Sequence, residues 1–187
     1  MFVHETIMKQ VSFSLLVLIC IVACHSKPKN NCKPYFEFDE LEHYSINISI
    51  EEEMRLMERD SLSSEELWLN DVLFQRKPAT LADSSLLINL EKIGFVKRIV
   101  NTSSFEAINT VFCAKKHKEF FATSCIAVYR DVLIFKKKGK IIGTAKICFE
   151  CLYHVIAGTI SNTDDFGQSG DYQRLKKLLY QKAKVED

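Results

Sequence analysis

The chain has 187 residues and a formal net charge of +1, because 25 lysines and arginines are balanced by 24 aspartates and glutamates. The two signs are scattered along the sequence, which excludes the concentrated basic surface typical of a nucleic-acid partner. Apolar residues make up 47% of the chain, enough for a proper hydrophobic core.

A short apolar run near the N-terminus leads directly into a cysteine. Residues 11–23 read VSFSLLVLICIVA, are followed by Cys24, and have Lys9 as a positive flank. As a helix the run would cover about 20 Å, too short for the roughly 30 Å hydrocarbon core of a membrane, but suited to a signal peptide. Glu5 is unusual in a region that should be basic, so translation is predicted to begin at Met8.

The end of this run, Ile21-Val22-Ala23-Cys24, resembles the lipobox of bacterial lipoproteins. The resemblance implies that residues 1–23 are a signal peptide and that Cys24 is acylated after cleavage. It also implies a lipid-anchored protein at the cell membrane or outer membrane, because multiple acyl chains anchor stably. The alternative is a non-lipidated secretory signal, in which case the triplets at Asn47 and Asn101 are potential glycosylation sites.

A tether and one domain are expected after the cysteine. Residues 24–34 are rich in lysine, asparagine and proline and have no core-forming periodicity. A flexible stretch of about ten residues has a reach of roughly 17 Å, which would hold a domain clear of the lipid headgroups. Residues 35–187 are then predicted to form a single globular domain of ordinary size.

The first half of this domain is predicted to be helical. Ser49, Ser63 or Ser64, and Asp83 precede helix-favouring segments as N-caps. Their apolar stripes are interpreted as core packing. The expected helices cover residues 51–59, 65–77, 84–92 and 105–115.

The second half of the domain has the residue preferences of strands. Strands are expected over residues 123–130, 132–136, 141–149 and 153–156, with a polar turn at 137–140. Asp171 is expected to start a final amphipathic helix. The predicted fold class is α+β, with a helical N-terminal half, an antiparallel β-meander in the C-terminal half and a closing C-terminal helix.

Cysteine is the residue type that carries most of the chemical interest. Of seven cysteines, Cys20 would leave with the signal peptide and Cys24 would carry the lipid. The number left is odd, so at least one thiol is expected to be unpaired, metal-bound or partnered between chains. The remaining cysteines are Cys32, Cys113, Cys125, Cys148 and Cys151.

The segment Cys148-Phe149-Glu150-Cys151 is the sharpest local motif. Positions three apart on a straight strand face opposite ways, so these two sulfurs can meet only if the chain turns. Structural disulfides or buried thiols are favoured by an exported location. Linking Cys125 to either cysteine would stabilise the fold by about 3.4 kcal/mol, against about 2 kcal/mol for the short Cys148–Cys151 link.

Two functional alternatives remain for the same cysteines. A short Cys148–Cys151 bond would be easily reduced, which is typical of redox chemistry. A zinc site would need four ligands, with Cys113, His117 and His154 as candidates beside Cys125, but no second close pair is present.

Arg130 and Asp131 interrupt an otherwise apolar stretch. Two adjacent charges there must be solvated at a turn or paired within the fold. They are interpreted as a tight connection between strands. The alternative is a ligand site in which Arg130 faces an anion and Asp131 orients it.

The order of Cys125, Tyr129-Arg130-Asp131, the ICFEC segment ending at Cys151, and Asp171-Tyr172 resembles small uncharacterised exported bacterial proteins. The resemblance implies no activity, but it selects Cys125, Arg130, Cys148 and Cys151 as the residues to test.

The sequence has no GxSxG, HExxH or GxxxxGK motif, which argues against an enzyme. The predicted function is a lipid-anchored cell-envelope protein with a binding or structural role, without a cofactor and with the membrane as its partner. The alternative is a thiol redox or zinc-binding protein that uses Cys125, Cys148 and Cys151.

Overall fold

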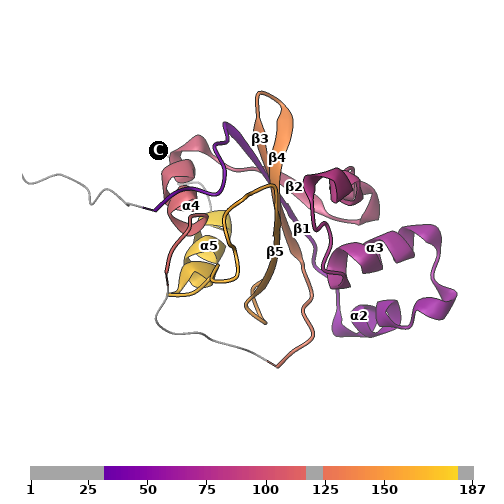
Figure 1. Ribbon diagram of the computed structural model, residues 1–187. Helices are drawn as coiled ribbons and strands as arrows, with labels where there is room; N and C mark the ends of the chain where they lie inside the picture. Colours follow the sequence, from indigo (N-terminus) through magenta and orange to yellow (C-terminus); the bar gives the residue numbers. More distant parts are fainter. Residues whose placement is uncertain (1–31, 117–123, 181–187) are drawn as a thin grey trace, which may run out of the picture. The chain divides into compact units, whose positions relative to one another are not determined.

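A five-stranded antiparallel sheet organises the domain in the computed structural model, which describes residues 32–116 and 124–180. The strand order is β2-β1-β3-β4-β5, and helices cover both faces of the sheet (Figure 1). The predicted signal peptide, Cys24 and His117 lie outside the described residues. The strands are β1 (Glu40–Ser45), β2 (Val96–Ile99), β3 (Asp131–Lys137), β4 (Lys140–Cys148) and β5 (Tyr153–Ala157).

One face of the sheet packs against α4 (Phe105–Val111), preceded by η4 (Thr102–Ser104), and α5 (Asp171–Tyr180). Its core contains many aromatic rings. The rings of Phe36 and Phe135 are 4.5 Å apart between centroids, and that of Phe112 lies 4.9 Å from Phe135. Gly143 on β4 lies beneath Phe36, and a Cβ there would overlap the ring, so this aromatic packing requires glycine.

The other face packs against α2 (Ile50–Met57), α3 (Ser64–Phe74) and two of three short 3₁₀ turns, η2 and η3. Leu56, Val72 and Leu73 of these helices meet Val132 and Ile134 of β3 in a second core. Side chains alternate across a strand, which is why neighbouring residues of β3 serve different cores. The 3₁₀ turns are η1 (Arg59–Ser61), η2 (Leu81–Leu87) and η3 (Leu90–Ile93).

A disulfide between Cys32 and Cys113 fastens the start of the described region to the segment after α4, with 5.6 Å between the two Cα atoms. Pro34 forms an isolated bridge with Cys113, and the Tyr35 amide donates to the Phe112 carbonyl at 2.8 Å. The compact unit that contains all the described residues therefore begins at Cys32, within the segment predicted to be a tether. Within the described ranges, no helix is long and apolar enough to cross a membrane.

The predicted fold class is wrong in its central feature, because the N-terminal half is not simply helical. It contributes β1 and β2, and β1 lies inside the sheet between β2 and β3. The sequence of β1, ELEHYS, has few strand-favouring residues. Its buried carboxylate, Glu42, is compensated by ion pairs with Lys97 and Lys136 from the two neighbouring strands. Those partners lie far away in sequence, so the local pattern does not predict the strand.

Two local expectations are also wrong. Residues 84–92 do not form an α-helix, because Asn89 has φ 59° and separates η2 from η3. Residues 124–130, the described part of a predicted strand, run past the end of α3 instead, where the Tyr129 amide donates to the Leu73 carbonyl at 2.8 Å. This segment therefore donates a hydrogen bond to a carbonyl of the last turn of α3 and does not pair as a strand of the sheet.

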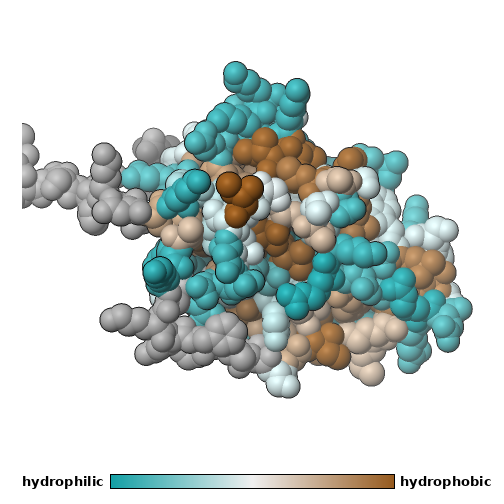
Figure 2. Space-filling model, viewed as in Figure 1, coloured by the Kyte–Doolittle hydropathy of each residue, from teal (hydrophilic) through white to brown (hydrophobic). Residues whose placement is uncertain are grey.

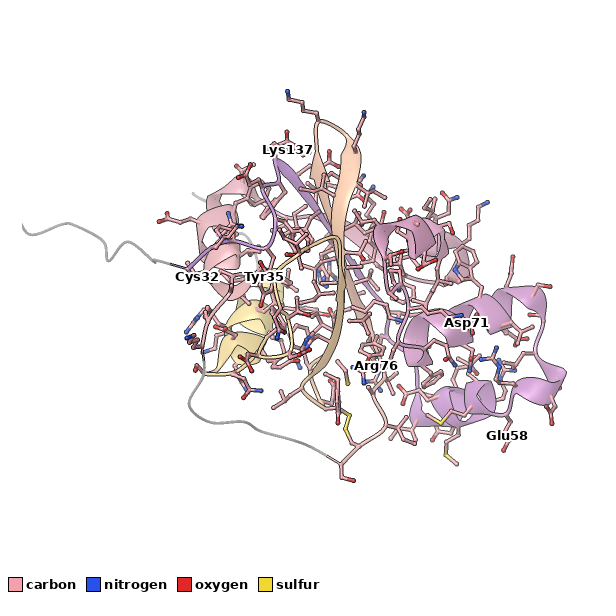
Figure 3. The ribbon with its side chains drawn as sticks, viewed as in Figure 1. Cys32, Tyr35, Glu58, Asp71, Arg76 and Lys137 are labelled. Carbon is pink, nitrogen blue, oxygen red and sulfur yellow. A yellow bond between two sulfur atoms is a disulfide. The ribbon has the colours of Figure 1, made fainter. Side chains whose placement is uncertain are left out.

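Several local signals are confirmed. Ser49 caps α2, and Ser63 forms a reciprocal capping box with Glu66 at the start of α3. The polar turn between β3 and β4 and the helix starting at Asp171 are also present. Lys137 marks this turn at the top of Figure 3, and Figure 2 shows the same end as hydrophilic with apolar residues below it.

Candidate functional site

The chain turns sharply between β4 and β5, and this turn brings the two cysteines of the ICFEC segment together. Cys148 is the last residue of β4, and the turn ends at Leu152, whose φ is 55°. The Cys151 amide donates a hydrogen bond to Cys148 Sγ at 3.4 Å. The condition set by the sequence is therefore met, since the pair lies on a turn and not on a straight strand.

Cys151 is joined by a disulfide to Cys125, with 5.9 Å between the Cα atoms. Figure 3 shows this bond in yellow at the end of the sheet. Cys148 keeps a free thiol and is 1% exposed, whereas Cys125 lies at the surface beside Ile126, which is 70% exposed. Together with Cys32–Cys113, this pairing confirms that one of the five cysteines is unpaired.

The cysteines do not form the zinc site considered from the sequence. Cys125 and Cys151 share a disulfide, and Cys113 belongs to the other one, so none of these sulfurs is a thiolate ligand. His154 lies on the opposite face, where its ring nitrogens contact the Tyr172 hydroxyl at 2.8 Å and the Thr163 carbonyl at 2.9 Å. Residues 32–116 and 124–180 contain no group of three or more histidines, cysteines or carboxylates arranged around a metal position.

Arg130 connects α2 to the thiol turn. Its guanidinium pairs with Glu53 of α2 and with Glu150 of the turn, at 3.3 Å in the second case. Glu150 Oε2 in turn lies 3.9 Å from Cys148 Sγ. The guanidinium therefore already faces two carboxylates, and it links α2 to the turn that carries the cysteines.

Asp131 is separated from Arg130 because it is the first residue of β3 and points to the α5 side of the sheet. Its Oδ1 accepts hydrogen bonds from Tyr180 at 2.6 Å and contacts His43 Nε2 at 2.7 Å. Burial, and then the bond to Asp131, raise the pKa of the Tyr180 hydroxyl. Arg130 and Asp131 therefore contact opposite faces of the sheet. Arg130 binds Glu53 of α2, and Asp131 binds Tyr180 at the end of α5.

Lys146 is a member of the site that the sequence interpretation missed. It is 0% exposed, its Nζ donates to the Gln75 carbonyl at 2.7 Å, and it lies 4.7 Å from the centroid of the Tyr129 ring. Burial lowers the pKa of this amine to about 7, against a smaller opposing effect of Asp71. The signal was available, because Lys146 shares a strand face with Cys148, two residues away.

Tyr129 links the amine to the cysteines. It packs in a small cluster with Cys148, Cys151 and Val155, apart from the two larger cores. Burial is the main cause that raises the pKa of its hydroxyl. The site thus combines a buried thiol, a disulfide with one exposed sulfur, an aromatic ring and a buried amine.

No family model matches the chain, and neither a curated protein nor a solved structure is similar to it.

Proposed function

We propose that this is an exported protein, anchored at the cell envelope by a lipid on Cys24, whose domain carries out thiol–disulfide exchange. The apolar run that ends at Cys24 supports the anchor. Two disulfides in the described domain are compatible with an oxidising compartment outside the cytoplasm. The exchange chemistry is supported by one observation above all, the free thiol of Cys148 held against disulfide-bonded Cys151.

The anchor is tested by growing expressing cells with an alkyne-tagged fatty acid. We expect the protein to carry the tag and to sediment with membranes, and Cys24→Ser to abolish both. Cys20→Ser is the matched control, because Cys20 would be removed with the signal peptide, and it should remain labelled. A tagged Cys24→Ser protein, or an untagged natural one, would contradict the anchor.

The exchange step needs no external oxidant or reductant. The Cys148 thiolate attacks Cys151 Sγ, the Cys148–Cys151 bond forms, and the Cys125–Cys151 bond breaks. Cys125 leaves as a thiolate and takes a proton from water, so the thiol has moved from a buried to an exposed position. Cys125 is the suitable leaving group because it is exposed and water can solvate its thiolate. If Cys151 left instead, its thiolate would be buried, which would cost free energy.

The free thiol then becomes available to a partner. An exposed Cys125 thiolate can attack a disulfide of another protein, forming a mixed disulfide while the second sulfur of that partner leaves as a thiolate. The structure contains the Cys125–Cys151 bond, so the shifted form with a Cys148–Cys151 bond is the minority state. Capture of Cys125 by a partner would draw the equilibrium forward.

The exchange is tested on the native full-length protein by trapping exposed thiols with excess iodoacetamide, followed by mass mapping without reduction. We expect the label on Cys125 and a new Cys148–Cys151 link, while Cys32–Cys113 stays intact as an internal control. Cys148→Ser removes the attacking sulfur and should leave Cys125 unlabelled. A natural protein in which Cys125–Cys151 stays intact throughout the treatment would overturn the exchange.

A further inference from the structure

We propose that Lys146 is the base that takes the proton from the Cys148 thiol, a role that rests on the exchange proposed above. The sheet brings the two side chains together, because residues two apart on β4 share a face. Lys146 lies opposite Val155 of β5 and Cys148 lies opposite Tyr153, so the two are adjacent in the ladder. Both side chains are buried.

One aromatic ring contacts both groups. Tyr129 packs with Cys148 in the small cluster and receives the Lys146 amine over its ring at 4.7 Å. An ammonium formed there is stabilised by the ring face and by the Gln75 carbonyl. The thiolate formed at the same time accepts the Cys151 amide hydrogen bond. Proton transfer therefore produces a pair of opposite charges on one face of β4, each with a hydrogen-bond partner in the structure.

The charged groups around Lys146 allow its amine to accept this proton. Asp71 on α3 favours the ammonium, and Arg76 just beyond α3 acts on Tyr129. Asp71 and Arg76 are both labelled in Figure 3. Tyr129, Tyr153 and Cys148 are the other titratable groups that face the cluster. Because burial lowers the pKa of Lys146 to about 7, the amine is partly neutral near neutral pH and keeps a lone pair after donating to Gln75.

Glu150 is the competing base, since its carboxylate lies 3.9 Å from Cys148 Sγ. It is 58% exposed on its side chain and paired with Arg130, so its charge is already compensated. The two candidate bases predict that different variants slow the exchange. Lys146→Gln removes one base and Glu150→Gln removes the other, each with little change in volume. After the exchange, Lys146 returns its proton to solvent and Cys125 takes one up, so the step balances.

The test is the rate of Cys125 labelling in the full-length protein as a function of pH, with Glu150→Gln as the matched control. We expect the natural protein and Glu150→Gln to show a rate that rises through pH about 7. We expect Lys146→Gln to be slower by roughly a hundredfold at neutral pH, with its inflection moved toward the ordinary thiol value of about 8.5. Lys146→Met serves as a second variant without a base and should behave in the same way.

The outcomes separate the two proposals. Labelling of Cys125 that is unchanged in rate and pH profile by Lys146→Gln and Lys146→Met overturns the role of Lys146 and leaves the exchange standing. Loss of the pH dependence in Glu150→Gln alone assigns the proton to Glu150 and also overturns it. An absence of Cys125 labelling in the natural protein at every pH contradicts the exchange itself.

Discussion

Replacing both Cys32 and Cys113 by serine should lower the free energy of unfolding by about 4.5 kcal/mol. The bond joins residues 81 positions apart, and a cross-link stabilises a protein mainly by restricting its unfolded chain, more so for longer loops. It also holds the first described residues against the end of α4 through Pro34. Urea unfolding of the full-length protein in mild detergent, followed by circular dichroism, measures the change.

The matched control is the second disulfide. Cys125 and Cys151 are separated by 26 residues, and the same relation gives a loss of about 3.5 kcal/mol for their double serine variant. The two variants should therefore differ by about 1 kcal/mol, with the long-range bond contributing more. An equal or reversed order would mean that local strain or residual structure in the unfolded chain outweighs loop length.

Lys146→Met should raise the free energy of unfolding at pH 7 by a few kcal/mol. In the folded protein burial lowers the pKa of the amine from 10.5 to about 7. The unfolded chain therefore binds the proton at a higher pH than the folded one. Stability that is fully present above pH about 10.5 is lost as the pH falls toward 7, at up to about 1.4 kcal/mol per unit. Methionine keeps the volume of the stem and removes this cost.

The measurement is the difference in stability between the natural protein and Lys146→Met at pH 7, 8 and 9. Other groups titrate in the alkaline range, including Lys97 and Lys136, whose pKa values are raised by Glu42, but they contribute equally to both proteins. The gap should shrink steadily as the pH rises. Parallel curves would show that Lys146 keeps its proton in the fold.

Local sequence signals predict those elements whose partners are also local. The β3–β4 turn, strand β5, the caps at Ser49 and Ser63, and the start of α5 all follow from residues within a few positions of each element. The central strand β1 does not, because it is stabilised by contacts with Lys97 and Lys136, more than fifty residues away. Its glutamates and histidine look unfavourable for a strand until those contacts are known.

In the cysteine site, too, some features can be predicted from the sequence, whereas others depend on contacts made only in the fold. The odd number of cysteines predicts an unpaired thiol, and loop entropy favours a bond from Cys125 over the short Cys148–Cys151 link. The identity of the free thiol is set by the β4–β5 turn, which buries Cys148 and directs Cys151 toward Cys125. Lys146 was overlooked because a lone lysine in an apolar strand looks like a surface residue until α3 is placed over it.

The position of β1 within the sheet also bears on how the chain folds. Strands β3, β4 and β5 follow one another directly and can pair as soon as they are made, but β3 then presents an open edge. Only β1 closes that edge, through pairs such as Glu40 with Lys136 that span nearly a hundred residues. Closing so large a loop is slow, and until it happens the exposed edge can pair with β1 of another copy. From the strand order we therefore expect domain swapping through β1 as a folding error.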